Sequence, residues 1–561
     1  MSHNEMRLVA TAEFVLALAL CLGAQKQTTQ APTIVFDNVS EHTGIAFTLD
    51  NCVTERKHQI ETMIAGLATF DYDNDGRLDL YFVNGAQIPA LAKSDPRFYN
   101  RLYRNNGDGT FSDMTERAGV RGEGFGMGIA VGDYNNDGWQ DFYLAGVNRN
   151  QLFRNNGNGT FSDVTEQAGV RGLNAKQSKT WAISAGWLDY DNDGDLDLFV
   201  VNYVNWSIET EPACKVENIP AYCSPNSYEG QPNMLFRNNG DGSFTDVSEV
   251  SGIGKHIGKG MGVALADYDN DGFTDIFVSN DTYRHFLFRN KGNGTFAENG
   301  ILSGVAYNEN GKSIAGMGAD FRDVNNDGRP DIFVVGMIGD TFPLFVNRGR
   351  DFRDVTSPSG VAKATVGVTA WGSGIVDFDN DCFKDLFASC AAILDNSEQI
   401  DRLPARLPPM VLRNLGNGGF ADVSAEAGPG FRTPAAHRGV AFGDLDNDGR
   451  IDTVITRQHE RPAVFLNRSP APNHWLLVNL TGTKSNRDGL GARIQVTLPS
   501  GRVLYNHAGT SVGYSASSDK RVHFGLGPAE RAEKIEILWP SGIRQTLVGV
   551  KADQVLTVRE Q

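Results

Sequence analysis

Residues 71–85 read DYDNDGRLDLYFVNG, an acidic loop of pattern DxDxDGxxD that runs directly into a short apolar segment. Each copy of this loop follows a glycine- and alanine-rich stretch such as GMGIAVGDY and precedes a run of apolar or β-branched residues such as LDLFVVN. Runs of this kind, bounded by Gly and Asn, are typical of β-strands, and their recurrence indicates a repeat architecture. The other copies begin at Asp133, Asp189, Asp267, Asp323, Asp377 and Asp444.

A second motif follows the acidic loop in most repeats. Near copies are LYRNNGDGTFSDMT (residues 102–115), LFRNNGNGTFSDVT (152–165) and LFRNNGDGSFTDVS (235–248), with weaker ones further along the chain. The NNGDG or NNGNG segment between two apolar runs is typical of a tight β-hairpin, because Asn and Gly tolerate positive φ. One repeat therefore contains four strands, and four-stranded repeats of roughly 50 residues predict the blades of a β-propeller.

The ends of the repeat array predict how the ring closes. After the seventh acidic loop comes a third strand, AVFLNR (residues 463–468), but no fourth strand of the F-x-D-V-T type follows it. A spare copy, VFDNVSEHTGI (35–45), precedes the first loop instead, and it would supply the missing outer strand. We predict an all-β protein: a seven-bladed β-propeller over residues 33–470 and a small β-sandwich-like domain over residues 473–561.

The acidic loops have the pattern of a site for a hard cation. Ca²⁺ prefers six to eight oxygen ligands, and side chains at positions 1, 3, 5 and 9 of a tight loop can converge on one ion. The glycine at position 6 permits the turn, but Cys382 replaces it in the sixth loop, which we expect to be strained, weaker or empty. The predicted ligands of up to seven Ca²⁺ ions are Asp71, Asp73, Asp75 and Asp79; Asp133, Asn135, Asp137 and Asp141; Asp189, Asp191, Asp193 and Asp197; Asp267, Asp269, Asp271 and Asp275; Asp323, Asn325, Asp327 and Asp331; Asp377, Asp379, Asp381 and Asp385; and Asp444, Asp446, Asp448 and Asp452.

Asp, Asn and Gly are also good turn formers, so a single copy of the loop would be weak support for a metal. Seven copies in phase favour metal binding, and clustered carboxylates repel one another unless a cation neutralises them. We expect the metal to stabilise the blades rather than to catalyse, because the loop supplies protein oxygens all round the ion.

The repeats resemble the FG-GAP/VCBS type found in integrin α-subunit propellers, from about Thr33 to Arg468. The tail resembles the ASPIC/UnbV family through NRDGLGARIQV (residues 486–496), SSDKRVHFGLG (517–527) and IEILWPSGIRQ (535–545). These resemblances imply extracellular, Ca²⁺-linked and adhesive roles. Independently of them, the tail alternates short apolar strands with PSG turns, which is typical of a small β-sandwich.

Export is expected from the N-terminus. Arg7, the apolar run 14–22 and Gly23-Ala24 have the order of a signal peptide over residues 1–24, which predicts a secreted or extracytoplasmic protein. After this segment, the sequence contains no run of about 18 apolar residues, the length that would predict a transmembrane helix. Cys214 and Cys223 lie in one loop and are the best candidates for a disulfide, whereas the pairing of the other cysteines stays open. A formal charge of −17 argues against nucleic acid as a partner.

Long insertions mark the face where a partner is expected. The acidic loops and the NNGDG turns lie on one face of the predicted ring, whereas the insertions at residues 85–100, 203–232 and 391–409 join second to third strands on the other face. Binding residues concentrate on loops held by a rigid scaffold. Tyr203, Trp206 and Tyr222 are candidate aromatic contacts there, with packing around a Cys214–Cys223 bridge as the alternative.

The predicted function is adhesion or recognition of an extracellular protein or glycan. The alternative is a propeller enzyme or a lectin that acts on extracellular carbohydrate through the central channel or the insertion-bearing face. Common nucleophile, zincin and phosphate-loop motifs are absent from the sequence, and the sequence leaves the ligand and the oligomeric state open. The candidate catalytic histidines, for which no partner constellation is evident, are His58, His256, His285 and His437.

Overall fold

The computed structural model describes residues 34–173, 178–470 and 472–561, so the expected signal peptide at residues 1–24 lies outside the described residues. Strands dominate the described chain and helices are short, which confirms the all-β class. Across the same residues, no helix has both the length and the apolar character needed to cross a membrane. The α-helices are α2 (Ile60–Met63), α3 (Thr115–Ala118), α4 (Thr165–Ala168), α5 (Ser248–Ser251), α6 (Val361–Thr365) and α7 (Ser397–Ile400).

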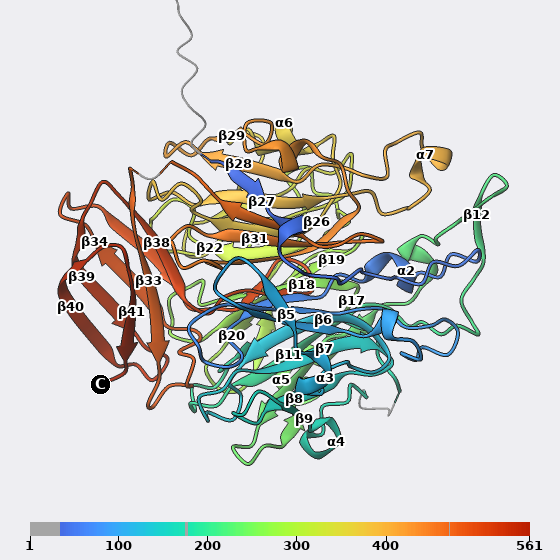
Figure 1. Cartoon of the computed structure of the whole chain (residues 1–561), viewed down its shortest axis with the longest axis horizontal. Coiled ribbons are helices and arrows are strands. Elements are labelled where there is room, and N and C mark those ends of the chain that lie inside the picture. Colours follow the sequence, from blue (N-terminus) through green and yellow to red (C-terminus); the bar gives the residue numbers. More distant parts are fainter. Residues whose placement is uncertain (1–33, 174–177, 471) are drawn as a thin grey trace, which may run out of the picture. The chain divides into compact units, whose positions relative to one another are not determined.

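Four antiparallel strands form the repeating sheet, as the two sequence motifs predicted, and they follow chain order except where β1 completes the last sheet. In the described part of the chain, seven sheets contain this unit, and Figure 1 colours their strands by position in the sequence, from blue to orange. The sheets are β2 (Leu67–Phe70), β3 (Asp79–Phe82), β4 (Arg101–Asn105) and β5 (Phe111–Asp113); β6 (Phe125–Gly132), β7 (Asp141–Val147), β8 (Gln151–Asn155) and β9 (Phe161–Asp163); β10 (Ala182–Leu188), β11 (Asp197–Asn202), β15 (Met234–Asn238) and β16 (Phe244–Asp246); β18 (Gly260–Ala266), β19 (Asp275–Asn280), β20 (Phe286–Asn290) and β21 (Phe296–Glu298); β22 (Ala319–Arg322), β23 (Asp331–Val334), β24 (Leu344–Asn347) and β25 (Phe352–Asp354); β26 (Ala370–Val376), β27 (Asp385–Cys390), β28 (Met410–Asn414) and β29 (Phe420–Asp422); and β30 (His437–Gly443), β31 (Asp452–Arg457), β32 (Ala463–Asn467) and β1 (Phe36–Asn38).

The first strands of successive sheets form a closed cycle. Each contacts the next in the order β2, β6, β10, β18, β22, β26 and β30, and β30 returns to β2. These strands are rich in glycine because their backbones approach closely: a Cβ on Gly262 would lie 2.6 Å from the carbonyl oxygen of Met317. The arrangement is that of a β-propeller.

Closure of the ring follows the sequence prediction. Strand β1 pairs antiparallel with β32, with Phe36 opposite Asn467, so the segment that precedes the first acidic loop completes the last sheet. Phe36 is buried and stacks on Phe431 with ring centroids 5.0 Å apart. The two ends of the repeat array are thereby held together by backbone hydrogen bonds and an aromatic contact.

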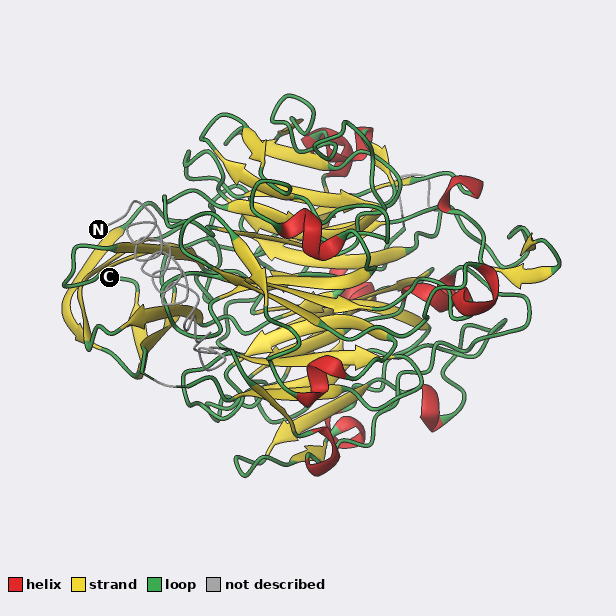
Figure 2. Ribbon diagram, turned by 90° about the horizontal axis from the view of Figure 1, so that it is seen from above, coloured by secondary structure: helices red, strands yellow, loops and turns green. Residues whose placement is uncertain are grey.

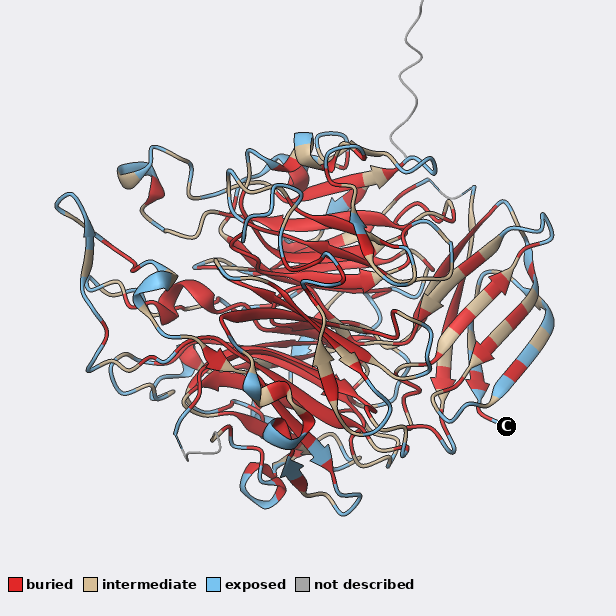
Figure 3. Cartoon of the chain, turned by 180° about the vertical axis from the view of Figure 1, so that it is seen from behind, coloured by how far each residue is buried: buried red, intermediate tan, exposed pale blue. Residues whose placement is uncertain are grey.

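The C-terminal region forms two sheets around a separate core. One sheet contains β38 (Val522–Gly527), β33 (His474–Thr481) and β41 (Gln554–Arg559), and the other contains β35 (Val503–His507), β34 (Arg493–Thr497), β39 (Arg531–Leu538) and β40 (Arg544–Lys551). Buried residues alternate with more exposed ones along these strands (Figure 3), as expected where only one face of each sheet meets the core. The expected β-sandwich-like arrangement is confirmed.

The two faces of the propeller carry different structures. The C-terminal sheets lie at the end where the acidic loops are, whereas α2, α7 and the hairpin of β12 (Cys214–Val216) and β13 (Ile219–Ala221) project from the opposite end (Figures 1 and 2). Contacts such as Arg493 Nη1 to Asp267 Oδ2 at 3.3 Å join the C-terminal sheets to the acidic loops. The insertions therefore occupy the face that remains free of the C-terminal domain.

A hairpin from the C-terminal domain enters the centre of the ring. Residues 509–519, here called the plug, contain β36 (Ser511–Val512) and β37 (Ala516–Ser517), and β37 pairs parallel with the innermost strand β2. Tyr514 at its tip is fully buried, and its hydroxyl donates to the carbonyl of Met63 at 2.6 Å. The plug therefore fills the centre of the ring, and the space left on the insertion side lies beyond Tyr514.

Candidate metal centres

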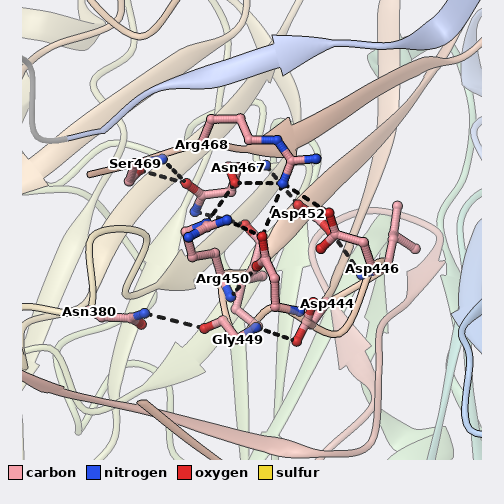
Figure 4. Close-up of polar contacts among 12 residues, drawn as sticks. Asn380, Asp444, Asp446, Gly449, Arg450, Asp452, Asn467, Arg468 and Ser469 are labelled. Atoms are coloured by element: carbon pink, nitrogen blue, oxygen red, sulfur yellow. Dashed lines mark hydrogen bonds and ion pairs between the residues drawn. The ribbon is translucent and has the colours of Figure 1, made fainter. Parts of the chain in front are cut away.

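Position 1 of each acidic loop organises the turn. In the first loop, Asp71 Oδ1 accepts the backbone N–H of Asp75 at 3.0 Å and Oδ2 accepts that of Gly76 at 2.9 Å. The seventh loop repeats these bonds from Asp448 and Gly449 to Asp444 (Figure 4). The other five loops have the same pair of bonds. The first carboxylate is thus fixed in one orientation by the loop backbone.

Positions 4 and 6 provide the left-handed backbone that curls the loop. Gly76 at position 6 has φ +84°. Position 4 was not singled out from the sequence, yet it is Asn in every loop, with φ between +56° and +62°. Asn enters this region more readily than other residues with a Cβ. These asparagines are Asn74, Asn136, Asn192, Asn270, Asn326, Asn380 and Asn447.

Position 9 ties the loop to the third strand of its sheet. Asp79 Oδ1 accepts the N–H of Asn105 at 2.8 Å, and Oδ2 accepts the N–H of Tyr72 at 3.1 Å. The bond from the third-strand Asn recurs in all seven loops. Each oxygen of Asp79 therefore already serves the fold, and each retains a lone pair that could face a cation.

Carboxylates at positions 1, 3 and 9 converge in most loops. Ligand oxygens lie within 4.8 Å of one another in the first, third, sixth and seventh loops, and the fourth loop gathers positions 1, 3 and 5. Burial raises the pKa of Asp189 and of Asp444 to about 7, since a carboxylate loses hydration there. The second and fifth loops place Asn135 and Asn325 at position 3, where an amide oxygen stands in for a carboxylate.

Several oxygens in these loops lack a hydrogen-bond partner among the described residues. Buried polar atoms are normally satisfied, so an orphaned oxygen requires an explanation. All of the orphaned loop carboxylate oxygens belong to predicted ligands, and oxygen-only donor sets suit Ca²⁺. The residues present therefore fit such an ion. The atoms are Oδ1 of Asp73, Asp191, Asp269 and Asp379, and Oδ2 of Asp141.

Arginines neutralise part of the loop charge, a role that was not predicted from the sequence. Arg468 Nη1 lies 2.9 Å from Asp446 Oδ2 and 3.0 Å from Asp448 Oδ2 (Figure 4). Arg104, Arg289 and Arg413 make equivalent pairs with positions 3 and 5 of the first, fourth and sixth loops. Protein side chains therefore neutralise part of the carboxylate charge, and for Arg104, Arg289 and Arg413 the repeated Arg before the third-strand Asn was the available signal.

Asparagines of the same motif link neighbouring sheets. Asn155 in the second sheet donates through Nδ2 to the carbonyl of Tyr72 in the first acidic loop at 2.8 Å. Asn105 in the first sheet donates to Leu445 in the seventh loop at 2.9 Å, so this set of bonds also runs round a closed cycle. The remaining members are Asn238, Asn290, Asn347, Asn414 and Asn467.

The sixth loop keeps the common geometry despite its cysteine. Cys382 has φ +79°, so the predicted strain at this position is present, yet Asp377, Asp379 and Asp385 still converge. Cys382 packs into the core of the C-terminal domain, and the N–H of Gly527 donates to the carbonyl of Asn380 at 2.9 Å. The replacement of glycine thus places an apolar side chain at the contact between the two domains.

The three aromatic residues proposed as partner contacts are buried instead. Tyr203, Trp206 and Tyr222 have exposed fractions of 0%, 9% and 7%. Tyr203 donates to Asp281 Oδ2 at 2.6 Å, and Tyr222 donates to Glu61 Oε2 at 3.1 Å. Tyr203 and Trp206 are therefore used in loop packing, the alternative given for them, whereas Tyr222 also lines the cavity on this face.

The four candidate histidines make separate structural contacts. Burial lowers the pKa of His285 and of His437 to about 4, and His437 Nδ1 lies 3.1 Å from the carbonyl oxygen of Cys390. His256 packs edge-on against Phe288. His58 Nδ1 lies 2.5 Å from Glu211 Oε2 in a buried pair that joins the 203–232 insertion to the segment before β2. These contacts explain the histidines through packing.

The insertions on the face opposite the acidic loops enclose a cavity. Cys214 and Cys223 form the predicted disulfide at the base of the β12–β13 hairpin, whereas Cys52, Cys382 and Cys390 are free thiols. The cavity has a volume of about 590 Å³ and is lined by the disulfide hairpin, by the 391–409 insertion and by residues at the inner strands. Ligand sites are commonly concave and of this size.

Comparisons with known proteins agree with the two predicted resemblances. The FG-GAP-like repeat model matches residues 71–144, 133–200, 222–278, 267–334 and 323–388, and the ASPIC and UnbV model matches residues 482–561. Cartilage acidic protein 1 of Mus musculus is 25% identical over 516 residues, with 88% of this chain and 73% of that protein covered. The Homo sapiens protein of the same name is 25% identical over 498 residues, with 85% and 69% covered. A rhamnogalacturonan lyase of Bacillus licheniformis is a distant structural match, with a TM-score of 0.40, 10% identity, and coverage of 88% of this chain and 82% of that chain.

Proposed function

This chain belongs to the FG-GAP-like repeat family, and from that premise we propose that it is an exported, calcium-binding β-propeller that recognises an extracellular protein or glycan. The proposed organisation is a signal peptide over residues 1–24, a propeller over 33–470 and an ASPIC/UnbV-type domain over 473–561. Ca²⁺ stabilises the blades, and the insertion-bearing face meets the ligand.

Orphaned carboxylate oxygens carry the calcium proposal. Four of the predicted ligands have one carboxylate oxygen that is buried without a partner among the described residues: Asp73, Asp191, Asp269 and Asp379. In Asp73, Asp269 and Asp379 the other oxygen contacts an arginine. Their neighbours in the loop are further oxygens at close range. A hard cation bound there would use the orphaned atom and offset the cost of burying the carboxylates.

An extracytoplasmic location is supported by the disulfide and by the relatives. Cys214 and Cys223 are paired in an exposed insertion, and such bonds persist in oxidising compartments. The animal relatives are named for cartilage, a tissue rich in extracellular matrix. The proposed signal peptide agrees with both observations.

The insertion-bearing face is proposed as the recognition surface because the other face is already occupied by the C-terminal domain. The β12–β13 hairpin carries Val216 at an exposed fraction of 42% beside the cavity. Lys57 pairs with Asp395 at 2.7 Å, and Asn396 Nδ2 donates to the carbonyl of Pro220 at 2.9 Å, so the insertions support one another. A surface built in this way is preorganised for binding.

Metal analysis tests the calcium part of the proposal. Purified protein is expected to hold several Ca²⁺ ions per chain, and chelation is expected to lower its melting temperature. Counting the bound metal by elemental analysis before and after chelation provides the measurement. A metal-free preparation whose melting temperature is the same with chelator and with millimolar calcium would remove this part of the proposal.

A binding array of matrix proteins and glycans tests the recognition part. Val216→Asp on the insertion face is expected to abolish capture of any ligand found. Val548→Asp is the matched control, because Val548 is an exposed valine (74%) in the C-terminal domain. Equal effects of the two substitutions would contradict the assignment of the face, and release of a chemically altered ligand would identify an enzyme instead of a binder.

A further inference from the structure

The cavity at the insertion-side mouth of the ring, here called the mouth cavity, has walls of two kinds. One wall is an apolar surface formed by methionines and a tryptophan: Met63, Met261, Met317, Met337 and Trp371. The other wall is formed by the insertions, which add aliphatic side chains. Methionine side chains adapt to ligands of irregular shape. The plug closes the inner side, since the Tyr514 ring lies 5.4 Å from that of Trp371 and its hydroxyl bonds to Met63.

One carboxylate is buried in this apolar wall. Asp281 lines the mouth cavity with an exposed fraction of 6%, and its Oδ2 accepts the hydroxyl of Tyr203 at 2.6 Å. Among the described residues, no lysine or arginine nitrogen lies within 4.0 Å of either oxygen of Asp281. The nearby Lys259 donates instead to Asn226 Oδ1 at 3.1 Å. A buried carboxylate normally has a cationic partner or a metal in contact with it, and here the positive charge of Lys259 lies nearby without contacting the carboxylate.

A second acceptor lies on the same wall. Gln59 lines the mouth cavity with 2% exposure, and its Oε1 has no hydrogen-bond partner among the described residues. Its backbone N–H is held by Glu211 Oε1 at 2.7 Å, so the residue is fixed in place. The wall therefore carries two acceptors, the carboxylate of Asp281 and the amide oxygen of Gln59.

The charge of the surroundings favours a cation over an anion. Arg438 lies behind Trp371, with its guanidinium carbon 4.3 Å from the ring centroid, but it does not line the cavity. Its N–H groups donate to the carbonyls of Thr62 and His437 and to Gln458 Oε1. Lys215 also lines the cavity, but it is exposed on the β12–β13 hairpin, so the charged group on the buried wall is the carboxylate of Asp281.

From this arrangement we propose that the mouth cavity binds an organic amine, with its apolar body against the methionines and its ammonium group donating to Asp281 and Gln59. This inference rests on the proposed function and names the chemistry of its ligand. An ammonium group has three donors and a full charge, which suits two acceptors of which one is ionised. The volume of about 590 Å³ admits a free amine or a lysine side chain with its apolar neighbours.

The pH dependence of binding gives a signature of Asp281. Burial raises the pKa of Asp281 to about 6, whereas Tyr203 and Lys259 oppose the rise and Asp340 adds to it. The carboxylate must be ionised to attract an ammonium group. Affinity is therefore expected to increase as pH rises through about 6 and then to stay level until the amine itself loses its proton.

Calorimetric titration of calcium-saturated protein tests the inference. The probes are 2-phenylethylamine, hexylamine and a blocked Leu-Lys-Leu tripeptide, with 2-phenylethanol as the neutral isostere. At least one amine is expected to bind ten or more times tighter than the alcohol. Binding of a free amine alone identifies a small-molecule ligand, and binding of the tripeptide alone identifies a lysine of a protein partner; both support the site.

Matched variants locate the binding. Asp281→Asn, which keeps an acceptor for Tyr203, is expected to weaken amine binding at least tenfold, whereas Asp401→Asn at the exposed rim changes it less than twofold. Equal affinity for amine and alcohol in the unmodified protein, or no binding of any probe at millimolar concentration, overturns the inference without reliance on a variant. Calcium-dependent melting is recorded on the same samples, so loss of the calcium response and loss of amine binding are separate results.

Discussion

At position 3 of the first loop, one carboxylate oxygen of Asp73 contacts Arg104 and the other has no partner among the described residues. This division shows how single residues serve two purposes: the outer oxygen reduces repulsion on the surface, and the inner oxygen faces further carboxylates. The arginine pairs are partly exposed and contribute little to stability by themselves. The inner oxygens are therefore the atoms on which the calcium proposal is best tested.

The effect of Asp191→Ala in the third loop on the free energy of unfolding is predicted to depend on calcium. In millimolar calcium the variant is expected to be less stable by about 2 kcal/mol, because loss of one ligand weakens a bound ion that stabilises the fold. In chelator it is expected to be as stable as the unmodified protein or more so, because an orphaned, repelled carboxylate is removed. Chemical denaturation under both conditions measures the difference.

Asp241→Ala is the control for that comparison. Asp241 lies in the exposed turn between the third and fourth strands of the same sheet and accepts the hydroxyl of Ser243. The change in the free energy of unfolding caused by Asp241→Ala should be small and the same in calcium and in chelator. A loss of stability for Asp191→Ala that is equal under the two conditions would show that the third loop holds no ion.

Glu560 provides a pH-dependent prediction at the same scale. Its Oε2 accepts the N–H groups of Thr483, Lys484 and Ser485, each at 2.8 Å. Burial alone would raise the pKa of Glu560, but hydrogen bonds from Ser541 and these backbone groups lower it from 4.5 to about 2. Because the pKa is lowered in the folded state, the ionised Glu560 stabilises the fold above about pH 4.5, and this contribution is lost as pH falls towards 2.

Glu560→Gln is therefore expected to cost about 2 kcal/mol at pH 7, since charge-assisted hydrogen bonds are lost. The difference from the unmodified protein should shrink as pH falls from about 4.5 to 2. Denaturation of the C-terminal domain at pH 7, 4 and 3 measures this trend, with the exposed Glu530→Gln as control. A difference that stays constant with pH would contradict the assigned role.

At the scale of strands and loops, the asparagine at the end of each third strand connects neighbouring sheets. Asn290 ends β20, is fully buried, and donates to the carbonyls of Tyr190 at 2.7 Å and Thr274 at 3.2 Å. Tyr190 belongs to the preceding acidic loop. The contact between sheets is thus made by a polar side chain that satisfies backbone groups left unpaired by the loop.

Asn290→Ala is predicted to destabilise the calcium-saturated protein by about 3 kcal/mol, because it leaves buried carbonyl groups without donors. Asn293→Ala is the matched control, since Asn293 lies in the exposed turn three residues later and bonds only locally to Thr295. Its expected cost is below about 1 kcal/mol. Similar unfolding free energies for the two variants would contradict the linking role of Asn290.

At the scale of the whole molecule, the C-terminal domain is part of the propeller's interior. The plug adds β37 to the sheet of β2, and the N–H of Gly513 donates to the carbonyl of Ala319 at 2.9 Å. Tyr514 contacts Trp371 and Met63, which also line the mouth cavity. Stability of the ring and the shape of its free face therefore both depend on the last part of the chain.

Substitutions of Tyr514 test this dependence. Tyr514→Phe removes one buried hydrogen bond and is expected to cost about 1 kcal/mol. Tyr514→Ala also leaves a cavity and is expected to cost about 4 kcal/mol. Hydrogen exchange should increase in the innermost strands β2, β22 and β26 in the alanine variant, whereas the outer strand β40 of the C-terminal domain should be little affected. Unchanged exchange in the innermost strands would show that the plug is not needed for closure.

The sequence by itself determined the repeating sheet, the acidic loops and the strand that closes the ring. These features depend on local chemistry, since period-2 apolar runs, Asn-Gly turns and Asp-rich loops specify the backbone from a few neighbouring residues. The match of β1 to β32 could be predicted for the same reason: a spare copy of the outer strand was visible in the chain.

Only the tertiary structure decided what fills the channel and which side chains face the free surface. The plug is built from a segment more than 400 residues away from β2, and no local pattern marks its destination. Likewise, Tyr203 and Tyr222 have the composition of contact residues but are buried by bonds to Asp281 and Glu61. Burial and pairing over such separations depend on which surfaces meet in space, and the chain specifies these only when it is folded.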